Sequence, residues 1–177
     1  MDSKTLIIYA SPKSNSFTKS VLTALGYNEQ NADFFNCYKN IPKPCFDCGL
    51  CKKEDACVNH DLDIFFEDFQ NAKHIVFAFP VYNCGLPAPL KALTDRFQRY
   101  FNKRFARNII PPMRGKRDVT IVMTMGAETD VSEYVLKQFK PLFTISGCRL
   151  KKTVTLSGTD RLKDKNNISD KIKITEE

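Results

Sequence analysis

Residues 6–18 read Leu6-Ile7-Ile8-Tyr9-Ala10-Ser11-Pro12-Lys13-Ser14-Asn15-Ser16-Phe17-Thr18. The apolar run at the start of this stretch predicts a buried strand, and a helical pattern follows the loop. The loop offers hydroxyl, amide and cationic groups. At a helix N-terminus, such groups and the free backbone N–H groups form a phosphate site. A simple turn with a helix N-cap explains the same residues, because serine, proline and asparagine are common in strand-to-helix turns.

The same loop lacks the glycine patterns of two familiar nucleotide sites. It has neither the Gly-x-Gly-x-x-Gly of a dinucleotide fold nor the Gly-Lys-Thr end of a nucleotide P-loop. We therefore expect a monophosphate that is held by side-chain hydroxyl groups.

Apolar runs and helical patterns alternate along the chain. Strands are predicted at 5–10, 31–38, 74–81, 118–124 and 148–156, and helices at 16–26, 61–72, 88–107 and 131–145. The alternation predicts an α/β fold, in which a doubly wound, five-stranded parallel sheet lies between two helix layers. We expect a single domain over residues 1–177, with a cysteine-rich loop at 42–60 and a polar tail at 159–177.

Composition narrows the class of protein. The 177 residues are 42% hydrophobic, enough for a core that needs no disulfides. We expect a soluble cytoplasmic protein, because the chain has no secretion signal, no membrane-length apolar run and seven cysteines, an odd number. The net charge of +7 arises in residues 91–177, which hold 19 Lys and Arg against 10 Asp and Glu, and favours anionic partners.

Three predicted loops follow strands of the parallel sheet. Ligands of such sheets bind beyond the carboxyl ends of the strands, where the strand order reverses. Segments 10–18, 80–87 and 124–130 occupy these positions. A phosphate on the first loop and a flat ring across the other two would suit a mononucleotide.

Two segments resemble a known family, the flavodoxin-like, NAD(P)H-dependent FMN reductases, and in particular their iron-sulfur flavoprotein branch. Residues 10–18 resemble the family's Gly-Ser-Pro-Arg-x-Asn-Gly-Asn-Thr phosphate loop. Residues 80–96 resemble its more specific Pro-Val-Tyr…Pro-Ala-x-Leu-Lys-x-x-x-Asp-Arg segment. The resemblance extends from the first strand to about Gly158.

This resemblance implies FMN as cofactor and NAD(P)H as co-substrate. It implies a phosphate site at Ser11, Lys13, Asn15, Ser16, Phe17 and Thr18. It places the flavin ring along Pro80, Val81, Tyr82, Asn83, Cys84 and Gly85, with the pyrimidine edge near Thr124, Met125, Gly126 and Ala127. It also implies a homodimer or higher homo-oligomer.

The sequence departs from the family at two places. Ser16 and Phe17 replace the usual glycine and asparagine, which predicts that one phosphate donor is missing. Residues 159–177 are polar and lysine-rich where the family has a final helix. We therefore expect another subunit to cover that edge of the sheet.

Four cysteines lie within thirteen residues, as Cys45-x2-Cys48-x2-Cys51-x5-Cys57. The compact spacing favours a [4Fe-4S] cluster, and the iron-sulfur flavoproteins carry a motif of this form. Free thiols and a zinc site are the alternatives. The remaining cysteines, Cys37, Cys84 and Cys148, are expected to pack in the fold.

Basic residues recur at helical spacing as Arg96, Arg99, Lys103 and Arg107. A solvated helix face is the common meaning of such a stripe, and a site for the NADPH phosphate or an acidic redox partner is the alternative. Asp61 and Asp63 are expected to cap the helix that follows them.

Three functions remain open from the sequence. The first is an FMN-dependent oxidoreductase that accepts hydride from NAD(P)H and passes electrons to a small molecule or a protein. The second is an FMN and iron-sulfur electron carrier without direct nicotinamide reactivity. The third and weakest is a nucleic-acid-binding module, for which no recognition motif is present.

Overall fold

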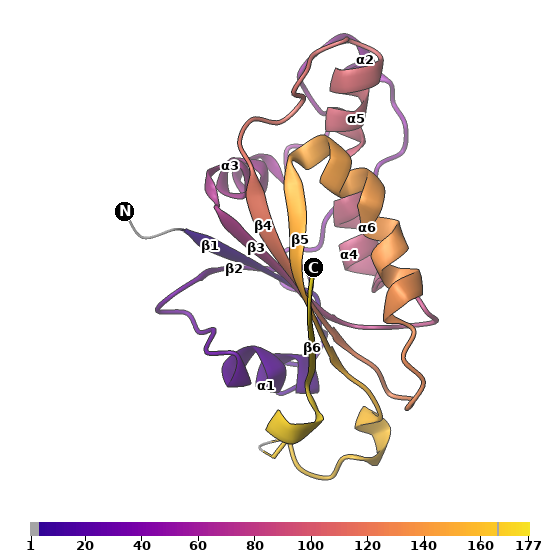
Figure 1. Ribbon diagram of the computed structural model, residues 1–177. Coiled ribbons are helices and arrows are strands. Elements are labelled where there is room, and N and C mark those ends of the chain that lie inside the picture. Colours follow the sequence, from indigo (N-terminus) through magenta and orange to yellow (C-terminus); the bar gives the residue numbers. More distant parts are fainter. Residues whose placement is uncertain (1–3, 166) are drawn as a thin grey trace.

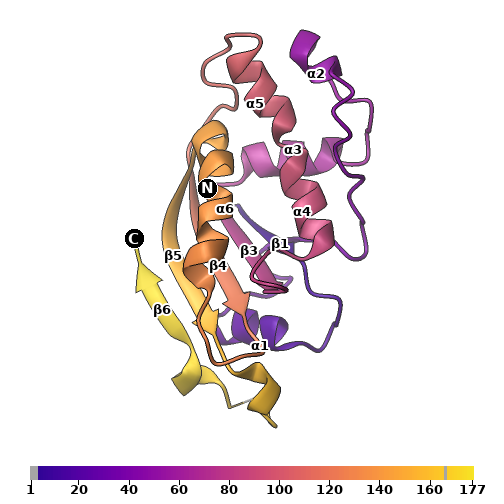
Figure 2. The same cartoon turned by 90° about the vertical axis from the view of Figure 1, so that its right-hand side faces the viewer.

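The computed structural model describes residues 4–165 and 167–177, and within them a six-stranded sheet lies between two layers (Figures 1 and 2). The strands are β1 (Thr5–Tyr9), β2 (Asp33–Asn36), β3 (His74–Pro80), β4 (Arg117–Thr124), β5 (Cys148–Leu156) and β6 (Lys173–Glu176). Their order is β2-β1-β3-β4-β5-β6. The first five strands are parallel, and β6 pairs antiparallel with β5.

Helices connect the strands. They are α1 (Phe17–Ala24), α2 (Leu50–Lys53), α3 (Asp63–Asn71), α4 (Ala88–Asp95), α5 (Gln98–Phe105) and α6 (Ser132–Ser146), with 3-10 turns at Thr159–Arg161 and Ser169–Lys171. The predicted flavodoxin-like α/β fold is confirmed. The strand order reverses between β1 and β3, because the chain leaves β1 for the β2 side and returns to β3 on the other side.

The sheet has one strand more than the five predicted. Lys173–Glu176 contains a single apolar residue, Ile174, so no apolar run marks it as a strand. Backbone pairing with Lys152–Thr155 of β5 fixes it nevertheless. The edge that we expected another subunit to cover is therefore paired within the chain.

The two faces of the sheet are covered differently. Helices α3–α6 cover one face, where Phe69, Phe97 and Phe139 pack against apolar residues of β1, β3 and β4. On the opposite face, α1 contributes Val21 and Leu22 to the second core cluster. The tail completes that layer, since Ile168 is buried there. The polar tail thus takes the place of a helix.

The helix predicted at 88–107 is divided into α4 and α5. At the junction, the N–H groups of Arg96 and Phe97 bond to carbonyls three residues earlier, at 3.1 Å each. Such i−3 bonds tighten the helix locally and turn its axis. The chain then continues as α5, which ends near residue 105.

Arg117, at the start of β4, is buried and joins three segments through backbone carbonyls. Its guanidinium donates to the carbonyls of Phe69 at 2.6 Å and Ser146 at 2.7 Å, which lie at the ends of α3 and α6. It also donates to carbonyls of Gln70, Arg114 and Gly115. The carbonyls at these helix ends have no further partner within their helices.

We expect Arg117→Met to lower the free energy of unfolding by about 3 kcal/mol, because several buried carbonyls lose a charged donor. The midpoint of urea unfolding measures this change. Lys116→Met, at the exposed neighbouring position, is the matched control and should leave the midpoint in place. Equal midpoints for both variants would contradict this role of Arg117.

Candidate functional site

A cavity of about 740 Å³ opens at the carboxyl edge of the sheet. The strand register places it there, because Tyr9 pairs with Ala78, and Thr124 pairs with both Pro80 and Leu156. The loops after β1, β3 and β4 therefore meet at the point where the strand order reverses. The lining residues are Ser11, Pro12, Lys13, Asn15, Ser16, Phe17, Thr18, Pro80, Val81, Tyr82, Asn83, Thr124, Gly126, Ala127, Thr159, Asp160 and Lys165.

Most of the residues implied by the family resemblance line this cavity, and three do not. Cys84 is exposed at the tip of a turn, and Gly85 bonds back to Tyr82. Met125 points into the core, where its sulfur accepts the N–H of Val131 at 3.5 Å. Pro12 and the three tail residues at 159, 160 and 165 also line the cavity, and no sequence pattern predicted them. The tail carries no local signal of its contact with the other loops.

In the loop after β1, the Ser16 hydroxyl is hydrogen-bonded within the protein, and the Ser11 hydroxyl faces the cavity. Ser16 Oγ accepts the N–H of Lys19 at 3.1 Å as the N-cap of α1, and lies 2.7 Å from the Tyr9 hydroxyl. Ser11 is only 4% exposed, and its hydroxyl has no hydrogen-bond partner among the described residues. Ser11, Lys13 and the first N–H groups of α1 are thus among the donors that remain for an anion.

Thr124 connects the three loops. Its hydroxyl lies 2.9 Å from the hydroxyl of Thr18 in α1, and both side chains are buried. Its carbonyl accepts the N–H of Val81 at 2.8 Å. The spacing between the loops is therefore set by hydrogen bonds within the protein.

The loop after β3 forms a tight turn beside the cavity. Tyr82 and Gly85 exchange backbone hydrogen bonds of 3.1 and 2.9 Å. The two residues between them have positive φ angles, +50° at Asn83 and +56° at Cys84. The turn holds Tyr82 at the rim of the cavity, where 45% of the residue is exposed.

The loop after β4 is held by the tail. The N–H groups of Gly158, Thr159 and Asp160 donate to the carbonyls of Ala127, Met125 and Gly126 at 2.8, 3.0 and 3.2 Å. With these carbonyls turned to the tail, the N–H groups of Gly126 and Ala127 have no partner among the described residues. A side chain at position 126 would collide with the Asp160 carboxylate, 2.5 Å from the Cβ position.

The cysteine-rich loop holds its four thiols apart. Cys45 and Cys48 are exposed, Cys51 Sγ accepts from the Asn102 amide at 3.1 Å, and Cys57 Sγ accepts from Arg96 at 3.4 Å. Within residues 4–165 and 167–177, no three His, Cys, Asp or Glu side chains are grouped as a metal ion requires. This arrangement does not fit a cluster or a zinc site. A cluster at these four cysteines stays a prediction.

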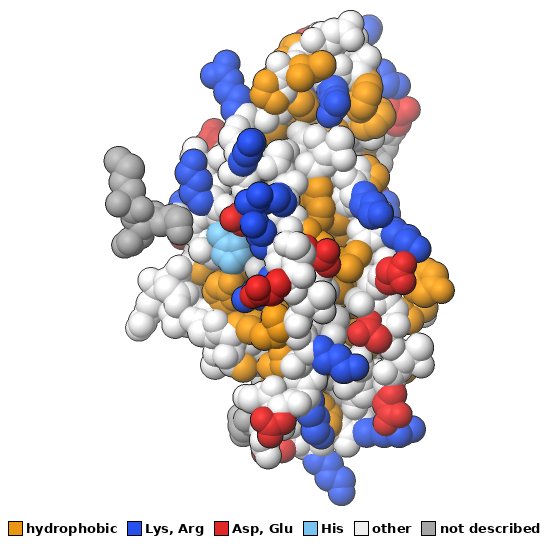
Figure 3. All heavy atoms as spheres, viewed as in Figure 1, with side chains coloured by type: hydrophobic (Ala, Val, Ile, Leu, Met, Phe, Trp, Pro, Cys, Tyr) orange, Lys and Arg blue, Asp and Glu red, His pale blue; other side chains and the backbone are white. Residues whose placement is uncertain are grey.

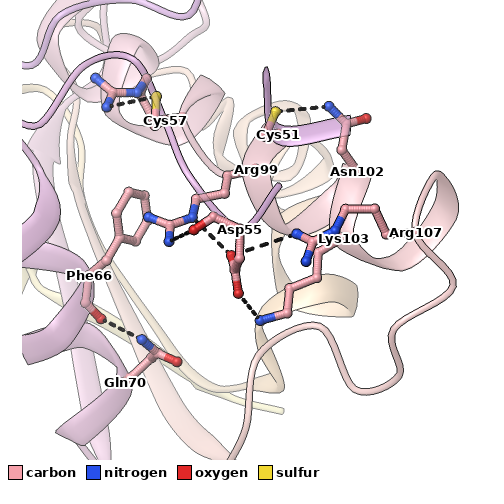
Figure 4. Close-up of polar contacts among 10 residues, drawn as sticks. Cys51, Asp55, Cys57, Phe66, Gln70, Arg99, Asn102, Lys103 and Arg107 are labelled. Atoms are coloured by element: carbon pink, nitrogen blue, oxygen red, sulfur yellow. Dashed lines mark hydrogen bonds and ion pairs between the residues drawn. The ribbon is translucent and has the colours of Figure 1, made fainter. Parts of the chain in front are cut away.

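The basic stripe is neither a solvated face nor a free anion site. Arg96 is buried, and its guanidinium donates to Asp61 at 2.8 Å and to the carbonyls of Lys43 at 3.0 Å and Asn59 at 2.6 Å. Arg99, Lys103 and Arg107 surround the carboxylate of Asp55 (Figure 4). All four cations therefore fasten the cysteine-rich loop to α4 and α5.

The role predicted for Asp61 is also corrected. Its carboxylate accepts the N–H of Lys43 at 2.8 Å as well as the Arg96 guanidinium, and does not cap α3. Partial burial raises the pKa of Asp61, but the hydrogen bonds and the charge of Arg96 outweigh burial and hold the pKa below its usual value. The pair therefore stays ionised near neutral pH.

We expect Arg96→Met to release residues 43–60 while the sheet stays intact, because the loop loses its central donor. Hydrogen exchange should become faster in this loop and remain slow in β3 and β4. Lys91→Met, at an exposed position of the same helix, is the control. An unchanged rate of hydrogen exchange in this loop of Arg96→Met would contradict the conclusion that Arg96 holds the loop in place.

The sheet order and the cavity at its reversal define a doubly wound α/β protein, a class whose ligands bind at the carboxyl edge of the sheet. A family model described as the flavodoxin-like fold matches residues 3–176, and the chain belongs to this family. Two solved structures share the fold. A NAD(P)H:quinone oxidoreductase from Methanothermobacter marburgensis has a TM-score of 0.68 at 15% identity and covers 96% of this chain and 91% of its own. An FMN-dependent NADH-azoreductase from Bacillus anthracis, in complex with FMN, has a TM-score of 0.59 at 19% identity and covers 96% and 93%.

Curated relatives match a shorter stretch. An iron-sulfur flavoprotein from Methanosarcina thermophila is 44% identical over 64 residues, which are 36% of this chain and 34% of the relative. One from Archaeoglobus fulgidus is 39% identical over 64 residues, or 36% and 33%. The match thus spans about a third of these relatives. Among the described residues, no helix has the length and hydropathy of a membrane span.

Proposed function

We propose that the protein is an FMN-dependent oxidoreductase that accepts hydride from NAD(P)H and passes the electrons to a small molecule or a protein. The observation that carries this proposal is the cavity at the strand reversal, with the Ser11 hydroxyl at one end and two N–H groups in the loop after β4 that have no partner among the described residues. The two similar structures, an FMN-dependent NADH-azoreductase and a NAD(P)H:quinone oxidoreductase, support hydride transfer from a nicotinamide to FMN as the chemistry.

The donors in the cavity suit the two polar ends of FMN. Ser11, Lys13 and the first N–H groups of α1 would hold the phosphate. The N–H groups of Gly126 and Ala127 would donate to the pyrimidine edge of the ring, where they would stabilise negative charge. FMN, when bound, supplies the hydride chemistry itself, and the protein contributes position and electrostatics.

The rim of the cavity leaves room for a second reactant. Tyr82 and Asn83 are exposed there, on a turn that positive φ angles keep tight. A nicotinamide ring would stack on the flavin from this open side. Action in the cytoplasm and assembly into a homodimer or higher homo-oligomer stay predictions.

The electron-carrier alternative is favoured by the names of the curated relatives. It needs the four cysteines to bind a cluster, and the separated thiols do not fit one. Iron and sulfide analysis after anaerobic purification tests it directly. About four of each per chain, without reduction by NADH or NADPH, would favour the carrier over the oxidoreductase.

The nucleic-acid alternative loses its main support. On the face in Figure 3, Lys and Arg side chains are interspersed with Asp and Glu, and do not form one patch. The basic stripe of α4 and α5 is occupied with Asp55, Asp61 and carbonyl groups.

We expect the purified protein to bind FMN and to be reduced by NADH or NADPH without oxygen. Loss of the flavin absorption band after mixing measures the reduction. A protein that binds FMN and is reduced by neither nucleotide, but is reduced by a ferredoxin, would support the carrier. A colourless protein that does not bind added FMN would contradict both flavin functions.

We expect Ser11→Ala to weaken FMN binding about tenfold, because a hydrogen bond to a charged phosphate contributes roughly 1.5 kcal/mol or more. Riboflavin, which lacks the phosphate, should bind both forms equally. Ser14→Ala is the control, since the exposed Ser14 does not line the cavity. Flavin fluorescence measures both affinities. An equal loss of affinity for FMN and for riboflavin would contradict the placement of Ser11 at the phosphate end of the flavin.

A further inference from the structure

The tail forms an arch over the loop after β1. At its start, the backbone of Gly158–Asp160 is bonded to the loop after β4. At its end, Ile168 is 2% exposed in the core beneath α1, and β6 follows in the sheet. The described residues between these anchors, 161–165 and 167, are thus held from both ends.

Lys165 is the residue by which this arch contacts the phosphate loop. Its ammonium group donates to the Asn15 carbonyl at 2.8 Å and lies 5.7 Å from the centre of the Phe17 ring. The side chain lines the cavity together with Ser11 and Lys13. Among the described residues, no carboxylate forms an ion pair with Lys165. Its charge is therefore still available to an anion.

The local sequence explains why a cation from the tail is needed there. The Ser16 hydroxyl is already bonded to the N–H of Lys19 and to the Tyr9 hydroxyl. The side chain of Phe17 contains no hydrogen-bond donor. Phe17 instead presents the ring over which Lys165 lies. Ser16 and Phe17, the departure from the family pattern, predict one phosphate donor fewer in this loop. The ammonium group of Lys165 lies beside them, although Lys165 is 150 residues further along the chain than Asn15.

We infer that Lys165 is a phosphate-binding residue, by which the tail selects a flavin with a phosphomonoester over one without it. The inference rests on the proposed function, because the flavin is the ligand that brings the phosphate to this loop. An ammonium group with three donors can keep its bond to Asn15 and donate to a phosphate oxygen as well. Lys165 is in this sense a specificity residue and takes no part in the redox chemistry.

The competing interpretation is purely structural, in which Lys165 only fastens the arch to Asn15 and Phe17. The two interpretations differ for riboflavin. If Lys165 only holds the tail in place, its loss would weaken the binding of FMN and of riboflavin alike. If Lys165 binds the phosphate, its loss would weaken the binding of FMN alone.

The experiment measures the dissociation constants of FMN and riboflavin for the full chain by flavin fluorescence, at low and high salt. We expect Lys165→Met to weaken FMN binding tenfold or more and to leave riboflavin binding within twofold. Lys165→Arg, which keeps the charge, should retain most of the affinity for FMN. Lys163→Met removes an exposed lysine from the same arch and should change neither constant. Salt should weaken FMN binding more in the wild type than in Lys165→Met.

Each other outcome is decisive. An equal loss for both flavins in Lys165→Met, or no loss for either, overturns the inference while the proposed function stands. A loss of FMN affinity in Lys163→Met equal to that in Lys165→Met also overturns it, because the effect then reflects net charge. If the wild type binds neither flavin, the proposed function and the inference both fall. Thermal unfolding of Lys165→Met at the wild-type midpoint excludes misfolding, and Lys165→Arg serves if that midpoint is lowered.

Discussion

The parallel register of β1, β3, β4 and β5 is the constraint on which the rest of the molecule depends. Since these strands are in register, their carboxyl ends lie at one edge of the sheet. Thr124 lies at the centre of that edge, where it pairs with Pro80 of β3 and Leu156 of β5. Its hydroxyl and its carbonyl then join the loops that follow β1 and β3. A shift of one residue in any of these pairings would turn the buried side chains of a strand to the other face and separate the loops. The cavity is thus a consequence of the sheet and needs no separate framework.

Away from this edge, two buried guanidinium groups join separate segments of the chain through backbone carbonyls. Arg117 joins the ends of α3 and α6 to the start of β4 through carbonyls alone. Arg96 joins the cysteine-rich loop to α4 in the same way, with one carboxylate added. A rigid fork of five donors can satisfy several carbonyls from different segments at once, which an ammonium group cannot do with the same geometry. These two arginines are buried for that reason, and their charges say little about what the protein binds.

Sequence patterns predicted what depends on neighbours in the chain. Five apolar runs predicted the five parallel strands, and the loops at 10–18, 80–87 and 124–130 predicted where the cavity lies. The patterns failed where a residue is fixed by a distant partner. Asp55 lies 44 residues from Arg99, and Lys165 lies 150 residues from Asn15. Helical spacing identified the basic stripe as one face of a helix, but its period holds no information about the loop that packs there. Likewise, β6 has one apolar residue, and only its backbone pairing makes it a strand.

The positive charge of residues 91–177 has a different meaning once these partners are known. Arg96, Arg99, Lys103 and Arg107 are paired with two aspartates of the other half of the chain, so the imbalance between the halves is partly neutralised across α4 and α5. Arg117 pairs with no carboxylate in the part of the chain that the structure describes, and is enclosed by carbonyl dipoles. Among the residues that line the cavity, the cations are Lys13, within the loop after β1, and Lys165, in the tail. These two lysines are the cations that the cavity offers to an anion, because most of the basic stripe is already paired within the fold.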